Sequence, residues 1–271
     1  MALRRTCFIA GLLAFPALAT SSAGAGIERR YAIGVHDIAV RDVDSHTYGI
    51  TAALILDERT ASGAHLFGDL DLFWDHDQDH LDPDHIPIWW QLHAGSDGEL
   101  WRGETGFHLD WIADVDTRAN TVSSVERQIA ALPALAARFD GDRLHASIAG
   151  GYGYWFLEID DDAPRERGYE RDGLRRTTWA ESLSGEMTFR VGQSVTIIGR
   201  AQEWWDGSQW LYAHYAGELH LSTDRWISRS EIALNAELNE YNFDPYNKPG
   251  LPSVVPWNDD MLFTVRFTTT W

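Results

Sequence analysis

The segment that most constrains the fold is 261–271, where apolar and polar side chains alternate. One face would carry Met261, Phe263, Val265, Phe267, Thr269 and Trp271, and the other Leu262, Thr264, Arg266, Thr268 and Thr270. A period of two residues is typical of a β-strand, because successive side chains point to opposite faces. The segment therefore predicts a strand with one apolar face and one face of polar or charged groups.

The same alternation recurs upstream. The clearest segment sets Trp101, Gly103, Thr105, Phe107, Leu109 and Trp111 opposite Arg102, Glu104, His108 and Asp110. A helix would not keep charges at strict alternation. We therefore expect about twelve strands, with ten as the competing number. Their approximate spans are 31–42, 47–57, 63–75, 87–96, 99–114, 120–139, 143–160, 173–191, 194–205, 209–222, 225–240 and 260–271.

One segment fits this pattern poorly. Between Val125 and Phe139 the charges do not alternate, and Pro133 interrupts the run. Proline is poorly tolerated inside a paired strand because it lacks the backbone N–H. The segment is therefore open to three interpretations, as a strand, a short helix or a loop folded inward.

Alternating strands in an even number, the last of them ending on an aromatic residue, resemble those of Gram-negative outer-membrane β-barrel proteins. The resemblance implies an all-β fold, a closed antiparallel up-and-down transmembrane barrel whose apolar faces contact lipid and whose polar faces line the lumen. Trp271 would then belong to the signal for the barrel-assembly machinery. Outer-membrane lipid and lipopolysaccharide would surround the protein, which would be small and porin-like.

The N-terminal residues suit an exported protein. Arg4 and Arg5 precede a short apolar run over 7–18, and Ala-x-Ala cleavage signals end at residues 19 and 25. This order is typical of a secretory signal peptide, although an N-terminal membrane anchor is the alternative. We expect 1–25 to be cleaved and 26–271 to form a single barrel domain. Cys7, the one cysteine, would leave with the signal, so disulfide and thiolate chemistry is not expected.

Composition excludes some partners. The net charge of −19 argues against binding to nucleic acid, whose partners carry basic patches. No run of about 18 apolar residues follows residue 25, so no transmembrane helix is expected. The 13 Trp, 11 Phe and 9 Tyr suit aromatic girdles at two membrane interfaces or a carbohydrate-binding surface. We expect the pairs Trp89-Trp90 and Trp204-Trp205 to be girdle residues, with Trp205 able to stack on a sugar.

The lengths of the connections test the barrel. In this family both termini are periplasmic, so the connections after odd-numbered strands face outward and tend to be longer. The tight connections 58–62, 96–98, 141–142, 191–193 and 222–224 fall on the expected periplasmic side. The long connections 75–86, 160–172 and 243–259 fall on the outer side. This agreement favours the barrel over a soluble periplasmic β-sandwich that binds carbohydrate.

The inward faces suggest a function. We expect solute contacts from charged and polar lumen residues: Arg102, Glu104, His108, Asp110, Arg200, His214, Glu218, Arg229, Glu231, Glu237 and Arg266. A barrel of twelve strands lies between eight-stranded barrels that side chains fill and sixteen-stranded open porins. The main hypothesis is a narrow channel for small polar or charged solutes of unknown identity. The alternative is that the charges pair across the interior, which would make the protein a plugged scaffold or binding protein.

An acidic loop is the sharpest local cluster. Asp75, Asp77 and Asp79 alternate like the first ligands of a calcium loop, but His80 stands where the central glycine belongs. The histidines nearby would instead suit zinc or copper. A solvated acidic loop without a specific ion is the third alternative. Calcium at this loop is the one cofactor that the sequence suggests.

The sequence supports a catalytic function less well than a channel function. His145 and Ser147 resemble the His-x-Ser pair of barrel lipid hydrolases, in which histidine activates serine. Ile148 and Ala149 follow where that family has Asn and Gly, and the pair lies beside an expected periplasmic turn. Asp69, Asp71 and the acidic loop offer only part of an omptin-like protease site. We therefore do not expect an enzyme.

Overall fold

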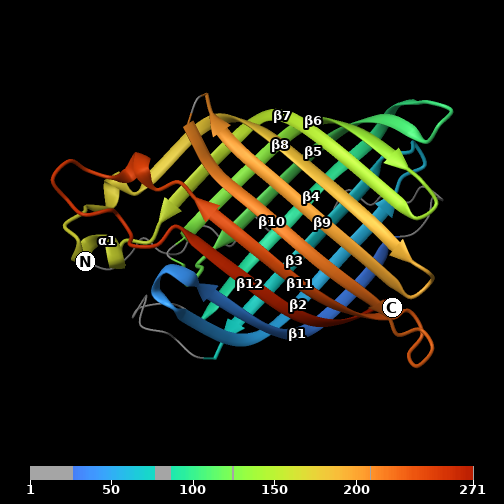
Figure 1. The fold of residues 1–271 in the computed structure, drawn as a ribbon, viewed down its shortest axis with the longest axis horizontal. Coiled ribbons are helices and arrows are strands. Elements are labelled where there is room, and N and C mark those ends of the chain that lie inside the picture. Colours follow the sequence, from blue (N-terminus) through green and yellow to red (C-terminus); the bar gives the residue numbers. More distant parts are fainter. Residues whose placement is uncertain (1–26, 77–86, 124, 208, 271) are drawn as a thin grey trace.

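Twelve antiparallel strands form one closed barrel within the part of the chain that the computed structural model describes, residues 27–76, 87–123, 125–207 and 209–270. Each strand pairs with the next in sequence, and β1 pairs with β12 to close the ring (Figure 1). This confirms the predicted fold and favours twelve strands over ten. The strands are β1 (Glu28–Val40), β2 (Ser45–Arg59), β3 (His65–Asp75), β4 (Ile88–Arg102), β5 (Phe107–Ala119), β6 (Val125–Asp140), β7 (Leu144–Ile159), β8 (Arg175–Val191), β9 (Val195–Asp206), β10 (Gln209–Ser222), β11 (Ser230–Tyr241) and β12 (Asp259–Thr270).

Helical structure is confined to four short segments in the described residues. They are η3 (Arg41–Val43), α1 (Asp162–Glu166), η4 (Arg171–Gly173) and η5 (Asp244–Tyr246). No helix in this part of the chain is long and apolar enough to cross a membrane. The expected signal peptide and Trp271 lie outside the described residues.

The two faces of the strands differ as the alternation predicts. On β1, Ile33 and Val35 are 67% and 55% exposed, whereas their neighbours Ala32 and His36 are buried. In a closed barrel alternate residues point outward and into the lumen. Exposed apolar side chains on every second position give the outer surface the apolar band that lipid requires.

The ends of the barrel also differ. The connections after even-numbered strands are short and gather at one end, here called the turn end; those after odd-numbered strands gather at the other, the loop end. Figure 1 shows α1 and the long segment before β12 at the loop end, on the left. Four predicted tight connections, near residues 60, 142, 192 and 223, lie at the turn end, so that part of the predicted parity is confirmed.

The fifth predicted turn, 96–98, was wrong. These residues lie inside β4, and the chain turns at 103–106 instead, where Gly106 takes a φ of 81°. Gly98 belongs in the strand because a Cβ there would lie 2.5 Å from Nε1 of Trp111 on β5. Glycine in a strand often marks such a close approach. The correction lengthens β4 and changes which residues of β4 and β5 face one another.

Residues 125–140 form a strand, β6, despite Pro133. Pro133 lies opposite Ala113 of β5, on the outward-facing set of positions. On the other side, Gly151 of β7 lies so close that a Cβ would meet the Pro133 carbonyl at 2.3 Å. The barrel therefore accommodates proline by bringing a glycine beside it, and the helix and inward-loop alternatives are excluded.

Candidate functional site

Polar side chains from distant strands meet inside the barrel. Arg266 on β12 forms an ion pair with Asp71 on β3, at 2.8 Å between Nη1 and Oδ1. These strands are separated in the sheet by β1 and β2, so the two side chains must project inward to meet. Arg266 therefore lies on the lumen face, as predicted.

One ion-pair network crosses β8, β9, β10 and β11. Arg200 on β9 donates to Glu186 on β8 at 2.8 Å and also to Glu218 on β10. His220 contacts Glu218 at 2.7 Å and Glu231 on β11 at 3.2 Å. Three predicted lumen residues, Arg200, Glu218 and Glu231, are thus brought together by one network.

A second group lies on β4, β5 and β6. Arg138 contacts Asp110 at 3.0 Å and Asp97 at 3.3 Å, and His108 lies 3.5 Å from Asp110. The remaining predicted pair, His214 on β10 and Glu237 on β11, is 3.7 Å apart. His108, Asp110, His214 and Glu237 therefore occupy inward positions.

Two predicted lumen residues lie in turns, and a third, Arg102, is paired with the inward-facing His108 but lies at the exposed rim of the turn end. Glu104 belongs to the turn at 103–106, and Arg229 belongs to the turn before β11 with a φ of 55°. Arg102 is the last residue of β4 and donates to Glu99 at 2.7 Å on an exposed part of the turn end. The strand positions predicted for Glu104 and Arg229 were wrong because each segment turns where its alternation suggested a continuing strand.

Water reaches the charges in the middle of the lumen. The side chains of Arg200 and Glu186 are 41% and 47% exposed although both belong to the inward-facing set. Charged groups of this kind need solvent or close partners, because burying an ion costs several kcal/mol. We call the inward-facing region from these residues to the turn end the hydrated half of the lumen.

Nearer the loop end, a buried ion pair joins opposite walls. Arg118 on β5 donates to Asp260 on β12 at 3.2 Å and to the hydroxyl of Tyr241 at 2.6 Å. Ser123 and Asn239 donate to the same carboxylate at 2.6 and 2.8 Å, and Asp260 is fully buried. We call these five residues the Arg118–Asp260 clamp. The sequence analysis missed it, because Arg118 was expected in a connection.

Apolar side chains fill the lumen around the clamp. The larger cluster includes Trp155, Trp204 and Tyr241 from the strands, and Tyr246 and Trp257 from the segment before β12. A smaller cluster comprises Ile38, Phe73, Trp89, Val122 and Leu262. We call both clusters together the loop-end layer. Trp89 and Trp204 therefore point inward, and the expectation that both members of each tryptophan pair are girdle residues was wrong.

The candidate hydrolase pair is not assembled. His145 Nδ1 lies 2.9 Å from Oδ1 of Asp140, which supplies the orienting carboxylate that sequence could not place. The other ring nitrogen, Nε2, is buried with no hydrogen-bond partner, and within the described residues no hydrogen bond joins His145 to Ser147. A histidine base must reach the serine hydroxyl to activate it. Asp140 thus orients His145, but within the described residues His145 does not make the contact with Ser147 that this chemistry requires.

Asp75, the first residue of the candidate calcium loop, lies at the end of β3 and is buried. Its Oδ1 accepts a hydrogen bond from Trp89 Nε1 at 3.0 Å and lies 2.8 Å from His36 Nε2. Asp75 therefore supports the loop-end layer. Asp77, Asp79 and His80 lie outside the described residues, and calcium binding there stays a prediction.

Asp160, Asp161 and Asp162 form an acidic cluster at the loop end, with carboxylate oxygens close together. Burial raises the pKa of Asp160 above its ordinary value. Arg165 contacts both Asp161 and Asp162, and Arg171 approaches Asp161 at 4.0 Å. Since arginines already neutralise it, this cluster resembles an ordinary loop network more than an ion site.

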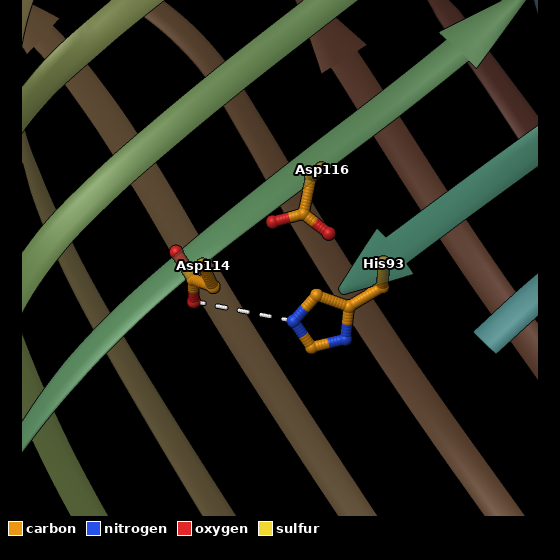
Figure 2. A group of neighbouring side chains, drawn as sticks. All are labelled: His93, Asp114 and Asp116. Atoms are coloured by element: carbon orange, nitrogen blue, oxygen red, sulfur yellow. Dashed lines mark ion pairs between the residues drawn. The ribbon is translucent and has the colours of Figure 1, made fainter. Parts of the chain in front are cut away.

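A different cluster lies in the hydrated half of the lumen. His93 on β4 and Asp114 and Asp116 on β5 each offer a ligand atom, and these atoms all lie within 4.8 Å of one another. Figure 2 shows the three side chains directed toward a common space. His93 and Asp116 are direct partners on adjacent strands, and Asp114 is two residues away on the same face. Sequence analysis missed this group.

Whole-fold comparison places this chain beside outer-membrane barrels. The NanC porin has a TM-score of 0.50 and 8% identity, over 89% of this chain and 98% of that one. The KdgM porin in complex with disordered oligogalacturonate has a TM-score of 0.46 and 10% identity, over 91% and 99%. The Salmonella typhi outer membrane phospholipase dimer with bound calcium has a TM-score of 0.44 and 8% identity, over 92% and 93%.

No protein-family model matches the sequence, and no curated protein matches it. At 8% identity, the likeness to the NanC porin concerns the fold alone. The chain thus has a porin-like fold, that of a small outer-membrane β-barrel.

Proposed function

We propose that this protein is a narrow outer-membrane channel for small charged solutes, with a closable loop end. One observation carries the proposal: inward-facing charges such as Arg200 and Glu186 are exposed to solvent within a closed barrel. Side chains that line a water path tune what passes. The NanC and KdgM barrels of similar fold are called porins, which agrees with this proposal.

The loop end would be the gate. The Arg118–Asp260 clamp joins opposite walls, and the loop-end layer surrounds it with apolar side chains. Apolar constrictions block ions by excluding water. In a barrel oriented with its long connections outward, this closure would lie on the outer side of the membrane. Openings of the wild-type channel should therefore be brief and rare.

A plugged barrel that serves as scaffold or binding protein is the second candidate. The loop-end layer favours it, because two buried apolar clusters and a buried ion pair are features of a stable core. The hydrated half favours the channel, since a plug has no need of solvent-exposed internal charges.

The lumen charges predict cation preference. Among the described inward-facing residues of the hydrated half, carboxylates outnumber arginines. The carboxylates are Glu28, Asp57, Asp69, Asp71, Asp97, Glu99, Asp110, Asp114, Asp116, Asp140, Glu186, Glu218, Glu231 and Glu237, and the arginines are Arg30, Arg59, Arg102, Arg138, Arg190, Arg200 and Arg266. A wall of one dominant sign concentrates counter-ions.

We expect the reversal potential in planar bilayers under a tenfold KCl gradient to have the sign of a cation-selective channel. The permeability to K⁺ should exceed that to Cl⁻ by about threefold or more. Substituting both Glu186→Gln and Glu218→Gln should reduce this preference, because Arg200 would then lack its partners. Anion preference in the wild type would refute the predicted selectivity. Silence of the folded protein over a broad voltage range would favour the plugged barrel.

A further inference from the structure

We infer that His93, Asp114 and Asp116 form a binding site for a divalent transition-metal cation in the lumen (Figure 2). Imidazole and carboxylate are ligands that Zn²⁺ and Mn²⁺ accept, whereas Ca²⁺ prefers oxygen alone. The site needs no open channel, so it is independent of the proposed function.

The backbone holds the three ligands on one rigid surface. His93 and Asp116 face one another across paired strands β4 and β5, and Asp114 follows on the same side of β5. The imidazole ring of His93 packs against Phe67 on β3, with 5.0 Å between ring centroids. Sites built on strands hold their ligands more exactly than sites on loops.

The three ligand groups make few contacts of their own, their one ion pair with the described residues being a long contact between His93 and Asp114 (Figure 2). Asp116 takes part in no hydrogen bond or ion pair with the described residues, and Oδ1 of Asp114 is buried without a hydrogen bond. Nε2 of His93 is 3.9 Å from Oδ2 of Asp114, which is too long for a hydrogen bond. By contrast, His220 and His65 approach their carboxylates to 2.7 and 2.8 Å. Unlike those pairs, His93 forms no hydrogen bond with the carboxylates beside it.

Among the described residues, no arginine forms an ion pair with Asp114 or Asp116. Arg200 on β9 acts electrostatically on His93, but it is already paired with Glu186 and Glu218. Asp69 on β3 lies directly opposite His93 and adds a third carboxylate beside the site. Like charges this close repel one another, and a divalent cation would relieve that repulsion.

The geometry needs little adjustment. Zn²⁺ lies about 2.0–2.2 Å from nitrogen or oxygen ligands, which in tetrahedral geometry places neighbouring ligand atoms roughly 3.5 Å apart. The present separations are at most 4.8 Å, so side-chain rotation without strand movement would close the site. Water from the hydrated half would complete the coordination.

The test is calorimetric titration of the folded full barrel in detergent with Zn²⁺ alone. We expect one site in the wild type, weakened about tenfold or more by His93→Gln and by Asp116→Asn, and largely retained in Asp116→Glu. His220→Gln is the matched control, because it removes a lumen histidine already held by two carboxylates, and it should leave Zn²⁺ affinity unchanged.

The outer acidic loop is the competing source of binding. A variant carrying Asp77→Asn, Asp79→Asn and His80→Gln should therefore be titrated in parallel, and we expect it to retain the site. Absence of wild-type binding, or loss of binding in the loop variant but not in Asp116→Asn, would overturn the inference. Asp116→Asn removes no hydrogen bond, so the variant should fold, as a heat-dependent gel shift would verify. None of these outcomes depends on channel conductance, so failure of the metal site and failure of the proposed channel function can be distinguished.

Discussion

Replacing Asp260 by asparagine should lower the free energy of unfolding of the barrel by about 3–5 kcal/mol. The substitution keeps the shape of the side chain but leaves the Arg118 guanidinium buried without its counter-charge. It also weakens the acceptor shared by Ser123 and Asn239. Breaking a buried pair costs far more than the pair is worth, because the remaining ion cannot be solvated.

Chemical denaturation of the barrel in lipid vesicles would measure this loss. Glu186→Gln is the matched control, since its ion pair with Arg200 is solvent-exposed and should contribute less than about 1 kcal/mol. The double variant Arg118→Met with Asp260→Leu should recover much of the stability, because it removes both charges. An Asp260→Asn variant no less stable than Glu186→Gln would show that the clamp is not a buried pair.

Replacing Gly34 by valine should prevent the barrel from closing. Gly34 lies on β1 opposite Arg266 of β12, at the seam where first and last strands pair. A Cβ there would lie 2.1 Å from the Val265 carbonyl oxygen and 2.9 Å from the Arg266 Cα. Both are backbone atoms, so relief requires the strands to separate. The cost should meet or exceed the roughly 1–3 kcal/mol typical of overpacking.

The yield of folded barrel, measured by the heat-dependent gel shift, should fall at least about tenfold in Gly34→Val, since about 1.4 kcal/mol already corresponds to a factor of ten. Gly199→Ala is the control: it lies on β9, and a Cβ there meets no atom within 4 Å. It should fold as the wild type does. Equal folding of Gly34→Val and Gly199→Ala would contradict the register of the seam.

The architecture was predictable because lipid and water impose opposite demands on alternate residues of every strand. For this reason the two faces of β12 could be assigned from sequence: Phe263 and Val265 are exposed on the outside, and Thr264 is buried on the inside. Turn positions were less predictable, because Ser96-Asp97-Gly98 and the true turn near Gly106 both carry turn residues. The close approach of Trp111 to Gly98 is a tertiary contact that sequence does not show.

That misplaced turn concealed the candidate metal site. A turn at 96–98 would set His93 opposite a residue near Trp101, whereas the observed register sets it opposite Asp116. The loop-end layer was hidden for another reason. Aromatic side chains are common both in an apolar plug and in a membrane girdle. Sequence alone therefore could not predict that Trp89 is buried inside the barrel.

The central claim is that one half of the lumen is hydrated and the other is filled. Cysteine accessibility tests it cleanly, because Cys7 is the one cysteine in the chain and lies in the segment expected to be cleaved. Ala180 and Glu186 belong to the same face of β8: Ala180 is fully buried in the loop-end layer, and the Glu186 side chain is 47% exposed.

The decisive measurement is therefore the rate at which a small water-soluble thiol reagent modifies Ala180→Cys and Glu186→Cys in folded barrels. We predict that the cysteine at position 186 reacts at least about a hundredfold faster, because reaction at 180 requires local opening costing a few kcal/mol. Similar rates at both positions would contradict the closed loop end, and an unreactive cysteine at position 186 would contradict the hydrated lumen.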